Sequence, residues 1–171
     1  FYAERDKPIP DMETRRAYDA EAYKLIQKFN ADLIILAGYV WAVTEIVVDN
    51  YMVVNTHPAD LSVVREDGFR PFAGADGVGN TLRDKSPVIC SSAHLATSQV
   101  DGWPVLFTSP DIPIDYNGFA DFAEMRKFYL LAVNEHSRLL TAKSLYDIAM
   151  CFFAVDGTGA LHHKGQPAPL G

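Results

Sequence analysis

Cysteine is scarce in this sequence, whose 171 residues include only Cys90 and Cys151. The two are far apart, and neither has partners nearby at the spacing of a metal site. This pattern predicts free thiols in a reducing compartment and no bound metal.

Basic charge and long apolar runs are also limited. The sequence has 15 Lys and Arg and 22 Asp and Glu, which gives a formal net charge of −7. Such a surface repels phosphate backbones, so no nucleic-acid partner is expected. The longest uncharged apolar run, 33–44, is too short to span a bilayer. The charged start, Phe1 to Asp6, does not resemble a signal peptide. We therefore predict a cytoplasmic protein without a membrane partner.

The first half of the chain predicts an α/β architecture within a single domain, 1–171. Helical periodicity runs from Met12 to Phe29, and the unbroken apolar run 33–37 is typical of a strand buried on both faces. A short helix over 44–50 and a strand over 51–55 follow. This order predicts a Rossmann-like, mostly parallel sheet with flanking helices.

The second half predicts further elements from its composition. Residues 59–72 form a charged loop, either a solvated excursion or a lid over a site. The remaining predicted elements are a helix over 74–84, strands over 87–97 and 104–108, a Pro-rich connector over 109–117, a helix over 119–151 broken near Glu135 and His136, and a terminal hairpin over 152–163.

The stretch Asn55-Thr56-His57-Pro58 is the first candidate site. If the strand persists to His57, both polar side chains lie on one face, and Pro58 then ends the strand. Ligands bind at the carboxyl ends of strands in open α/β sheets. A plain turn is the alternative, because Asn, His and Pro are also common in turns.

Several local patterns occur in a defined order. Asp32–Tyr39 is similar to a D-x-(apolar)₃-A-G-(aromatic) strand and turn, and Asn55–Pro58 to N-x-H-P. Ser92–Leu95 with Val100–Leu106 is similar to (S/T)-x-H-x followed by D-G-x-P, and Asn134-Glu135-His136 follows in the predicted helix. Together they resemble the folate-dependent formyltransferase family, closest to its phosphoribosylglycinamide (glycinamide ribonucleotide) branch.

Moving a formyl group between nitrogens requires oxyanion stabilisation and proton movement between two amines. Asn55 offers an N–H donor, His57 titrates near neutrality, and Asp101 can orient the imidazolium or move a proton through water. The resemblance assigns the catalytic roles to these same residues. Without it, Asp101 would be part of a reverse turn and His94 a partly buried strand residue.

The resemblance also implies a co-substrate, 10-formyltetrahydrofolate, and a small-molecule amine acceptor such as phosphoribosylglycinamide or an amino sugar. The implied activity belongs to one-carbon metabolism and purine biosynthesis. His94 and Glu135 are implied substrate-binding residues. The implied folate-binding residues are Gly38, Tyr39, Val40, Ala96, Thr97 and Val100. The alternatives are a formyltetrahydrofolate hydrolase and a non-catalytic folate-binding or oligomerisation module.

The sequence departs from the family pattern in several places. The family fold begins with a βαβ unit whose Gly-rich turn cradles a phosphate, and no G-x-G-S-N-like loop occurs here. We expect either a longer protein containing that unit or a shortened relative. A shortened relative would leave one sheet edge exposed or covered by a partner in a homo-oligomer. Trp41 and Trp103 replace the usual arginine and glycine, and the loop after His57 is longer.

Overall fold

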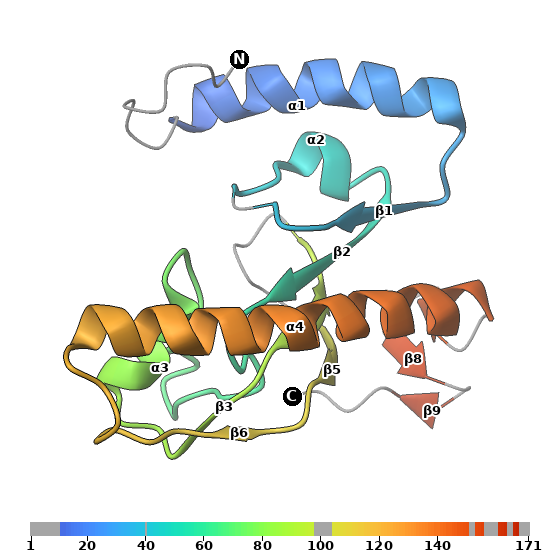
Figure 1. The fold of residues 1–171 in the computed structure, drawn as a ribbon. Helices are drawn as coiled ribbons and strands as arrows, with labels where there is room; N and C mark the ends of the chain where they lie inside the picture. The colour runs from blue at the N-terminus through green and yellow to red at the C-terminus, as the bar shows by residue number, and fades with distance from the viewer. Residues whose placement is uncertain are drawn as a thin grey trace.

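A computed structural model describes residues 11–39, 41–97 and 104–150, together with the backbone of 153–155, 161–163 and 166–167. Helices and strands alternate through much of this part (Figure 1). The elements are α1 Met12–Ile26, a 3₁₀ turn Gln27–Phe29, β1 Leu33–Leu36, α2 Glu45–Val48, β2 Met52–His57, α3 Gly77–Arg83, β3 Val88–Ile89, β4 Ser92–Leu95, β5 Val105–Thr108, β6 Ile112–Pro113, α4 Phe122–Ala149, β7 Phe153–Val155, β8 Leu161–His163 and β9 Gln166–Pro167.

The central sheet has the strand order β1-β2-β4-β5. Strands β1 and β2 are parallel, whereas β2 pairs with β4 and β4 with β5 in antiparallel register. The α/β prediction is confirmed, but a mostly parallel sheet is wrong for the described strands. For β4 and β5 the short connection 96–104 is the physical reason, because a parallel crossover needs about a dozen residues or more.

Helix α1 ends where the sequence indicates. Asp11 caps its start, accepting a 2.8 Å hydrogen bond from the Thr14 amide, and Asn30 ends the following turn in the left-handed conformation with φ 48°. The strand predicted next is β1, but it is half-buried along its whole length. The prediction of burial on both faces is therefore wrong, because β1 is an edge strand of the described sheet.

The strand predicted over 87–97 is two strands in two sheets. Val88–Ile89 pairs with Ile112–Pro113, and the central-sheet strand starts only at Ser92. Between them, the Ser91 amide donates to Ser109 Oγ at 3.0 Å and Ser91 Oγ donates to the Val133 carbonyl at 2.7 Å. These bonds replace ladder bonds, so one continuous strand does not form.

Helix α4 is unbroken over 28 residues, so the predicted break near Glu135 and His136 is wrong. Neither Pro nor Gly occurs between Phe122 and Ala149, and the polar pair lies off the core face. His136 Nδ1 lies 3.1 Å from Ser109 Oγ and ties the helix to the segment after β5. Among the described residues, no helix is both long and apolar enough to cross a membrane.

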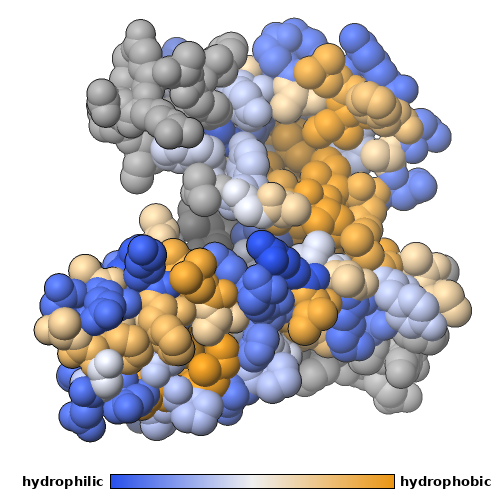
Figure 2. Space-filling model, in the orientation of Figure 1, coloured by the Kyte–Doolittle hydropathy of each residue, from blue (hydrophilic) through white to orange (hydrophobic). Residues whose placement is uncertain are grey.

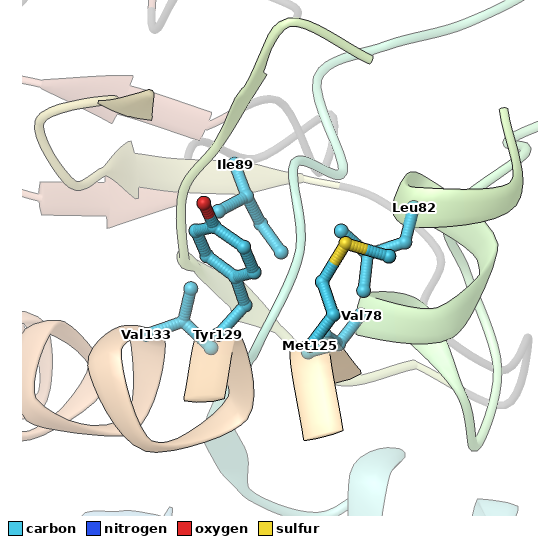
Figure 3. Packing of buried hydrophobic residues seen from close by; sticks show 6 residues of the cluster. All are labelled: Val78, Leu82, Ile89, Met125, Tyr129 and Val133. Atoms are coloured by element: carbon cyan, nitrogen blue, oxygen red, sulfur yellow. The ribbon is translucent and has the colours of Figure 1, made fainter. Parts of the chain in front are cut away.

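A buried cluster joins α4 to α3 and β3 (Figure 3). Its residues are Val78, Leu82, Ile89, Met125, Tyr129 and Val133. The Tyr129 hydroxyl is satisfied within this core, because it accepts a 2.7 Å hydrogen bond from the Asp115 amide. Beyond α4, the backbone of β7 and β8 pairs antiparallel, which confirms the terminal hairpin, and β9 adds a strand that the sequence did not predict.

Cys90 is expected to be inert in the folded protein. Its side chain is buried, and burial raises the pKa of its thiol from 9.0 to about 12. Since the thiolate is the reactive species, a Cys151→Ser variant should react with a disulfide reagent at pH 8 at least about a hundredfold more slowly than its urea-unfolded form. Comparable rates in both states would contradict the burial of Cys90.

Candidate functional site

A cleft of about 1070 Å³ lies where the ends of β1, β2 and β4 face α4. In Figure 2, hydrophobic residues gather above α4, over the region of β1. The sheet supplies Asn55 and His57 from β2 and His94 from β4, and the loop after β1 supplies Gly38 and Tyr39. The strand therefore does persist to His57, as the candidate motif required.

Asn55 and His94 meet because they are register partners on adjacent antiparallel strands. Cross-strand partners project to the same face of a sheet, and here Asn55 Nδ2 lies 3.3 Å from His94 Nε2. The other ring nitrogen, Nδ1, lies 3.2 Å from the Leu95 carbonyl. A carbonyl oxygen only accepts, so Nδ1 carries a proton and the neutral ring accepts at Nε2 from the Asn55 amide.

The Asn55 amide keeps hydrogen-bonding capacity for a ligand. Its Oδ1 atom is buried and has no hydrogen-bond partner among the residues that the structure describes, although a buried unpaired acceptor is costly. The Nδ2 group has two hydrogens, and His94 takes one of them. Asn55, which lines the cleft, thus has an acceptor without a described partner and a second N–H in its side chain.

His57 is buried, and its ring is fixed by the loop that follows it. Nε2 lies 2.7 Å from the Phe72 carbonyl, so this nitrogen is the donor. Phe72 is itself buried at the end of the long loop, together with Ala59 and Leu61 at its beginning. The loop is thus more than a solvated excursion, because its two ends pack beside His57.

Gly77 keeps the space that the His57 ring occupies. A Cβ atom at Gly77 would overlap His57 Nε2 and come within 2.9 Å of the Phe72 carbonyl oxygen. We expect Gly77→Ala to lower the free energy of unfolding by about 1–3 kcal/mol, because backbone must move. Urea denaturation measures this loss, and the signal of the His57 Nε2 proton in a nitrogen-15 NMR spectrum should shift.

Gly118→Ala is the matched control for Gly77→Ala. A Cβ atom at Gly118 would approach only the Asp115 carboxylate, at 3.2 Å, and that side chain can move. Its stability should change by less than about 0.5 kcal/mol. Equal losses for the two variants would show that the space beside His57 is not special.

A buried ion pair shapes the loop after β1. Arg15 Nη2 lies 2.9 Å from Asp19 Oδ1 and donates to the Tyr39 hydroxyl at 2.6 Å, while Nε donates to the Ala42 carbonyl at 3.0 Å. Asp19 Oδ2 accepts from the Thr44 amide at 2.6 Å. Burial raises the pKa of Tyr39, although the Arg15 hydrogen bond opposes this. Helix α1 thereby holds one wall of the cleft.

Asp76 connects the N-terminus of α3 to α4. It caps α3, accepting from the Gly79 amide at 3.2 Å, and it accepts from Arg126 Nε at 2.7 Å and Arg83 Nη1 at 3.0 Å. Burial alone would raise the pKa of this carboxyl, but the bonds from the two arginines outweigh it and lower the pKa. Arg126 lines the cleft, so its position depends on this pair.

The structure brings most of the predicted residues to one cleft. Those that line it are Asn55, His57, His94, Gly38, Tyr39, Ala96 and Thr97. Glu135 is not among the lining residues: it is exposed and paired with Arg138 at 2.7 Å. Asp101, Val40 and Val100 lie outside the described residues. Within the described ranges, no group of three or more His, Cys, Asp or Glu could hold a metal.

Helix α4 contributes a wall of the cleft that the sequence did not predict. Its lining residues are Arg126, Leu130, Asn134, Ser137, Arg138 and Thr141. Most lie three or four positions apart, and Ser137 and Arg138 are adjacent, so together they form one helix face beside the buried face. A polar stripe next to an apolar one is the sequence signal that could have indicated them. Trp41 also lines the cleft.

Comparison with known proteins supports the fold. No protein-family model and no curated protein sequence matches the chain. The phosphoribosylglycinamide formyltransferase of Anaplasma phagocytophilum has a TM-score of 0.68 and 16% identity, over 85% of this chain and 65% of that one. The corresponding Coxiella burnetii enzyme has a TM-score of 0.70 and 17% identity, over 90% and 65%.

A second kind of protein shares the fold. A formyltetrahydrofolate deformylase from Pseudomonas syringae has a TM-score of 0.68 and 18% identity, over 93% of this chain and 50% of that one. The chain spans less than two thirds of each of these three proteins. With its mixed sheet and flanking helices, the chain has the Rossmann-like α/β fold of the folate-dependent formyltransferases, as its motifs indicated.

Proposed function

We propose that this protein transfers a formyl group from 10-formyltetrahydrofolate to a small-molecule amine. One observation carries the proposal: Asn55 lines a large cleft beside His57 and His94, while its buried Oδ1 has no hydrogen-bond partner within the described part of the chain. An amide that presents both a donor and an acceptor suits a reaction between an amine and a formyl carbonyl.

The chemistry assigns a role to each group. The amine nitrogen attacks the formyl carbon, a C–N bond forms, and the carbonyl electrons move to oxygen. The free N–H of Asn55 stabilises that oxyanion, and Oδ1 accepts from the attacking amine. The C–N bond to the folate then breaks, and a proton moves from the incoming to the departing nitrogen. His57 is proposed to stabilise the oxyanion too, with Asp101 orienting it or relaying the proton through water.

A hydrolase is the second candidate, since a formyltetrahydrofolate deformylase shares the fold. Water would then replace the amine as the attacking group, and the same Asn, His and Asp would serve. The geometry of Asn55 suits both reactions, because water also donates a hydrogen bond to Oδ1. The acceptor therefore has to be identified by assay.

The discriminating experiment follows tetrahydrofolate release by absorbance. The protein is incubated with 10-formyltetrahydrofolate alone, and then with phosphoribosylglycinamide or an amino sugar. Release only with an amine supports the transferase, and release in water alone supports the hydrolase. No release under any condition, with an Asp101→Asn variant that binds the folate as the wild type does, would instead support a non-catalytic folate-binding module.

A further inference from the structure

The outward face of α4 is apolar, although it points away from the core. Figures 1 and 2 place α4 across the near side of the molecule, with hydrophobic patches among hydrophilic ones. Exposed fractions are 53% for Phe128, 61% for Leu131, 70% for Leu139 and 60% for Tyr146. We call the row Phe128, Leu131, Glu135, Leu139, Ala142 and Tyr146 the outer stripe of α4.

Helical geometry places the outer stripe on one face. Its members are three or four positions apart, and at 100° per residue they fall within an arc of about 80°. The core residues Met125, Tyr129 and Val133 are centred about 120° around the helix from the stripe, and the cleft-lining residues occupy the remaining side. A surface helix normally carries polar residues where this stripe lies, so an apolar row there indicates an interaction surface.

We propose that the outer stripe of α4 binds the same stripe of a second copy of this chain, with the two helices antiparallel. A two-fold axis near Ser137 places Phe128 opposite the partner's Tyr146, which gives an aromatic pair at each end. The Phe128 ring is already held in place, because it packs against Phe119 with a centroid distance of 5.3 Å. An interface of this kind must be self-complementary.

Charge supports the same register. Glu135 and Arg138 are strongly exposed, at 68% and 75% of their side chains, and they pair within one helix at 2.7 Å. In the antiparallel arrangement, Arg138 lies at nearly the same height as the partner's Glu135. The two intrahelical pairs thus become one four-charge cluster of alternating sign at the two-fold axis. Such an arrangement fixes register more than it adds affinity.

The expected dimer is weak. The outer stripe is roughly 28 Å long at 1.5 Å per residue, and one helix pair lies at the low end of stable interface sizes. Each copy also carries a net charge of −7, and the two therefore repel at low salt. We expect a dissociation constant on the order of micromolar near physiological salt. The proposal does not depend on the enzymatic function.

Sedimentation velocity of the full protein over a range of concentrations at 150 mM NaCl tests the dimer. The mass should double as concentration rises, and Leu139→Lys should raise the dissociation constant at least about tenfold, because the lysine occurs twice near the axis. Leu25→Lys is the matched control: Leu25 is 56% exposed on α1, and its variant should dimerise like the wild type. A monomer at every concentration would overturn the proposal.

A charge swap tests the register. Glu135→Arg alone and Arg138→Glu alone each place four like charges at the axis, so each variant should be mostly monomeric at concentrations where the wild type is dimeric. An equimolar mixture restores alternating charges across the interface and should form a heterodimer. Failure of the mixture to associate, or equal weakening by Leu25→Lys, would show that α4 does not pair in this way.

Discussion

Asp19→Ala should lower the free energy of unfolding by about 3–5 kcal/mol, because it removes the buried carboxylate that pairs with the Arg15 guanidinium at 2.9 Å. Both residues are 2% exposed. The Asp19 carboxylate also accepts from the Thr44 amide at 2.6 Å, so the substitution orphans a buried backbone donor as well. Urea denaturation followed by circular dichroism measures the loss. A change below about 1 kcal/mol would contradict a charged, dry pair.

Two controls separate this effect from a general loss of α1. Glu21→Ala removes the exposed Glu21–Lys24 pair of the same helix, at 2.6 Å, and should cost less than about 0.5 kcal/mol. A double variant, Arg15→Met with Asp19→Leu, should lose less stability than Asp19→Ala, because no buried charge remains. If the double variant loses as much stability as Arg15→Met and Asp19→Leu lose separately when added together, the two residues are not coupled.

The sequence predicted local helices and strands better than it predicted contacts between distant segments. Helix α1 could be placed because its apolar period depends on residues a few positions apart, and Asn30 ends the following turn. The strand through His57 could be placed for the same reason, since a β-rich run followed by Pro58 defines its own end. The shared face of Asn55 and His57 then follows from the alternation of a strand.

Contacts between distant segments could not be predicted in this way. The break between β3 and β4 depends on Ser91 bonding to Ser109 and Val133, which are 18 and 42 positions away. The packing of α4 against α3 and β3 likewise joins residues far apart in sequence, whereas the continuity of α4 could have been predicted locally, since neither Pro nor Gly interrupts it and Glu135 is a good helix former. A continuous apolar run such as β1 does not reveal whether its strand is central or at an edge.

The candidate site shows both kinds of inference. Asn55 and His57 came from a local motif, whereas the pairing of Asn55 with His94 depends on register between β2 and β4. The anchoring of His57 by the Phe72 carbonyl has no sequence signal at all, because any residue supplies a carbonyl. Resemblance to a family indicated His94 as a site residue, but only the structure shows which of its atoms faces Asn55.

Asn55→Ala should lower kcat for the proposed formyl transfer by about a hundredfold to a thousandfold, as the loss of one oxyanion donor does in acyl transfer. The fall should appear in kcat with little change in KM, because the oxyanion exists only near the transition state. Asn55→Asp should be at least as damaging although it keeps the shape. A carboxylate has no N–H to donate, and its charge opposes the developing oxyanion.

His162→Ala, in the terminal hairpin, is the matched control and should keep its rate. Asn55→Ala should lower the melting temperature by only a few degrees, since the amide's one described hydrogen bond is the 3.3 Å contact with His94 Nε2 and its Oδ1 has no partner among the described residues. That combination, a large loss of rate with little loss of stability, separates a catalytic Asn55 from a structural one. An Asn55→Ala enzyme that keeps more than a tenth of its rate would instead place the oxyanion donors elsewhere in the cleft.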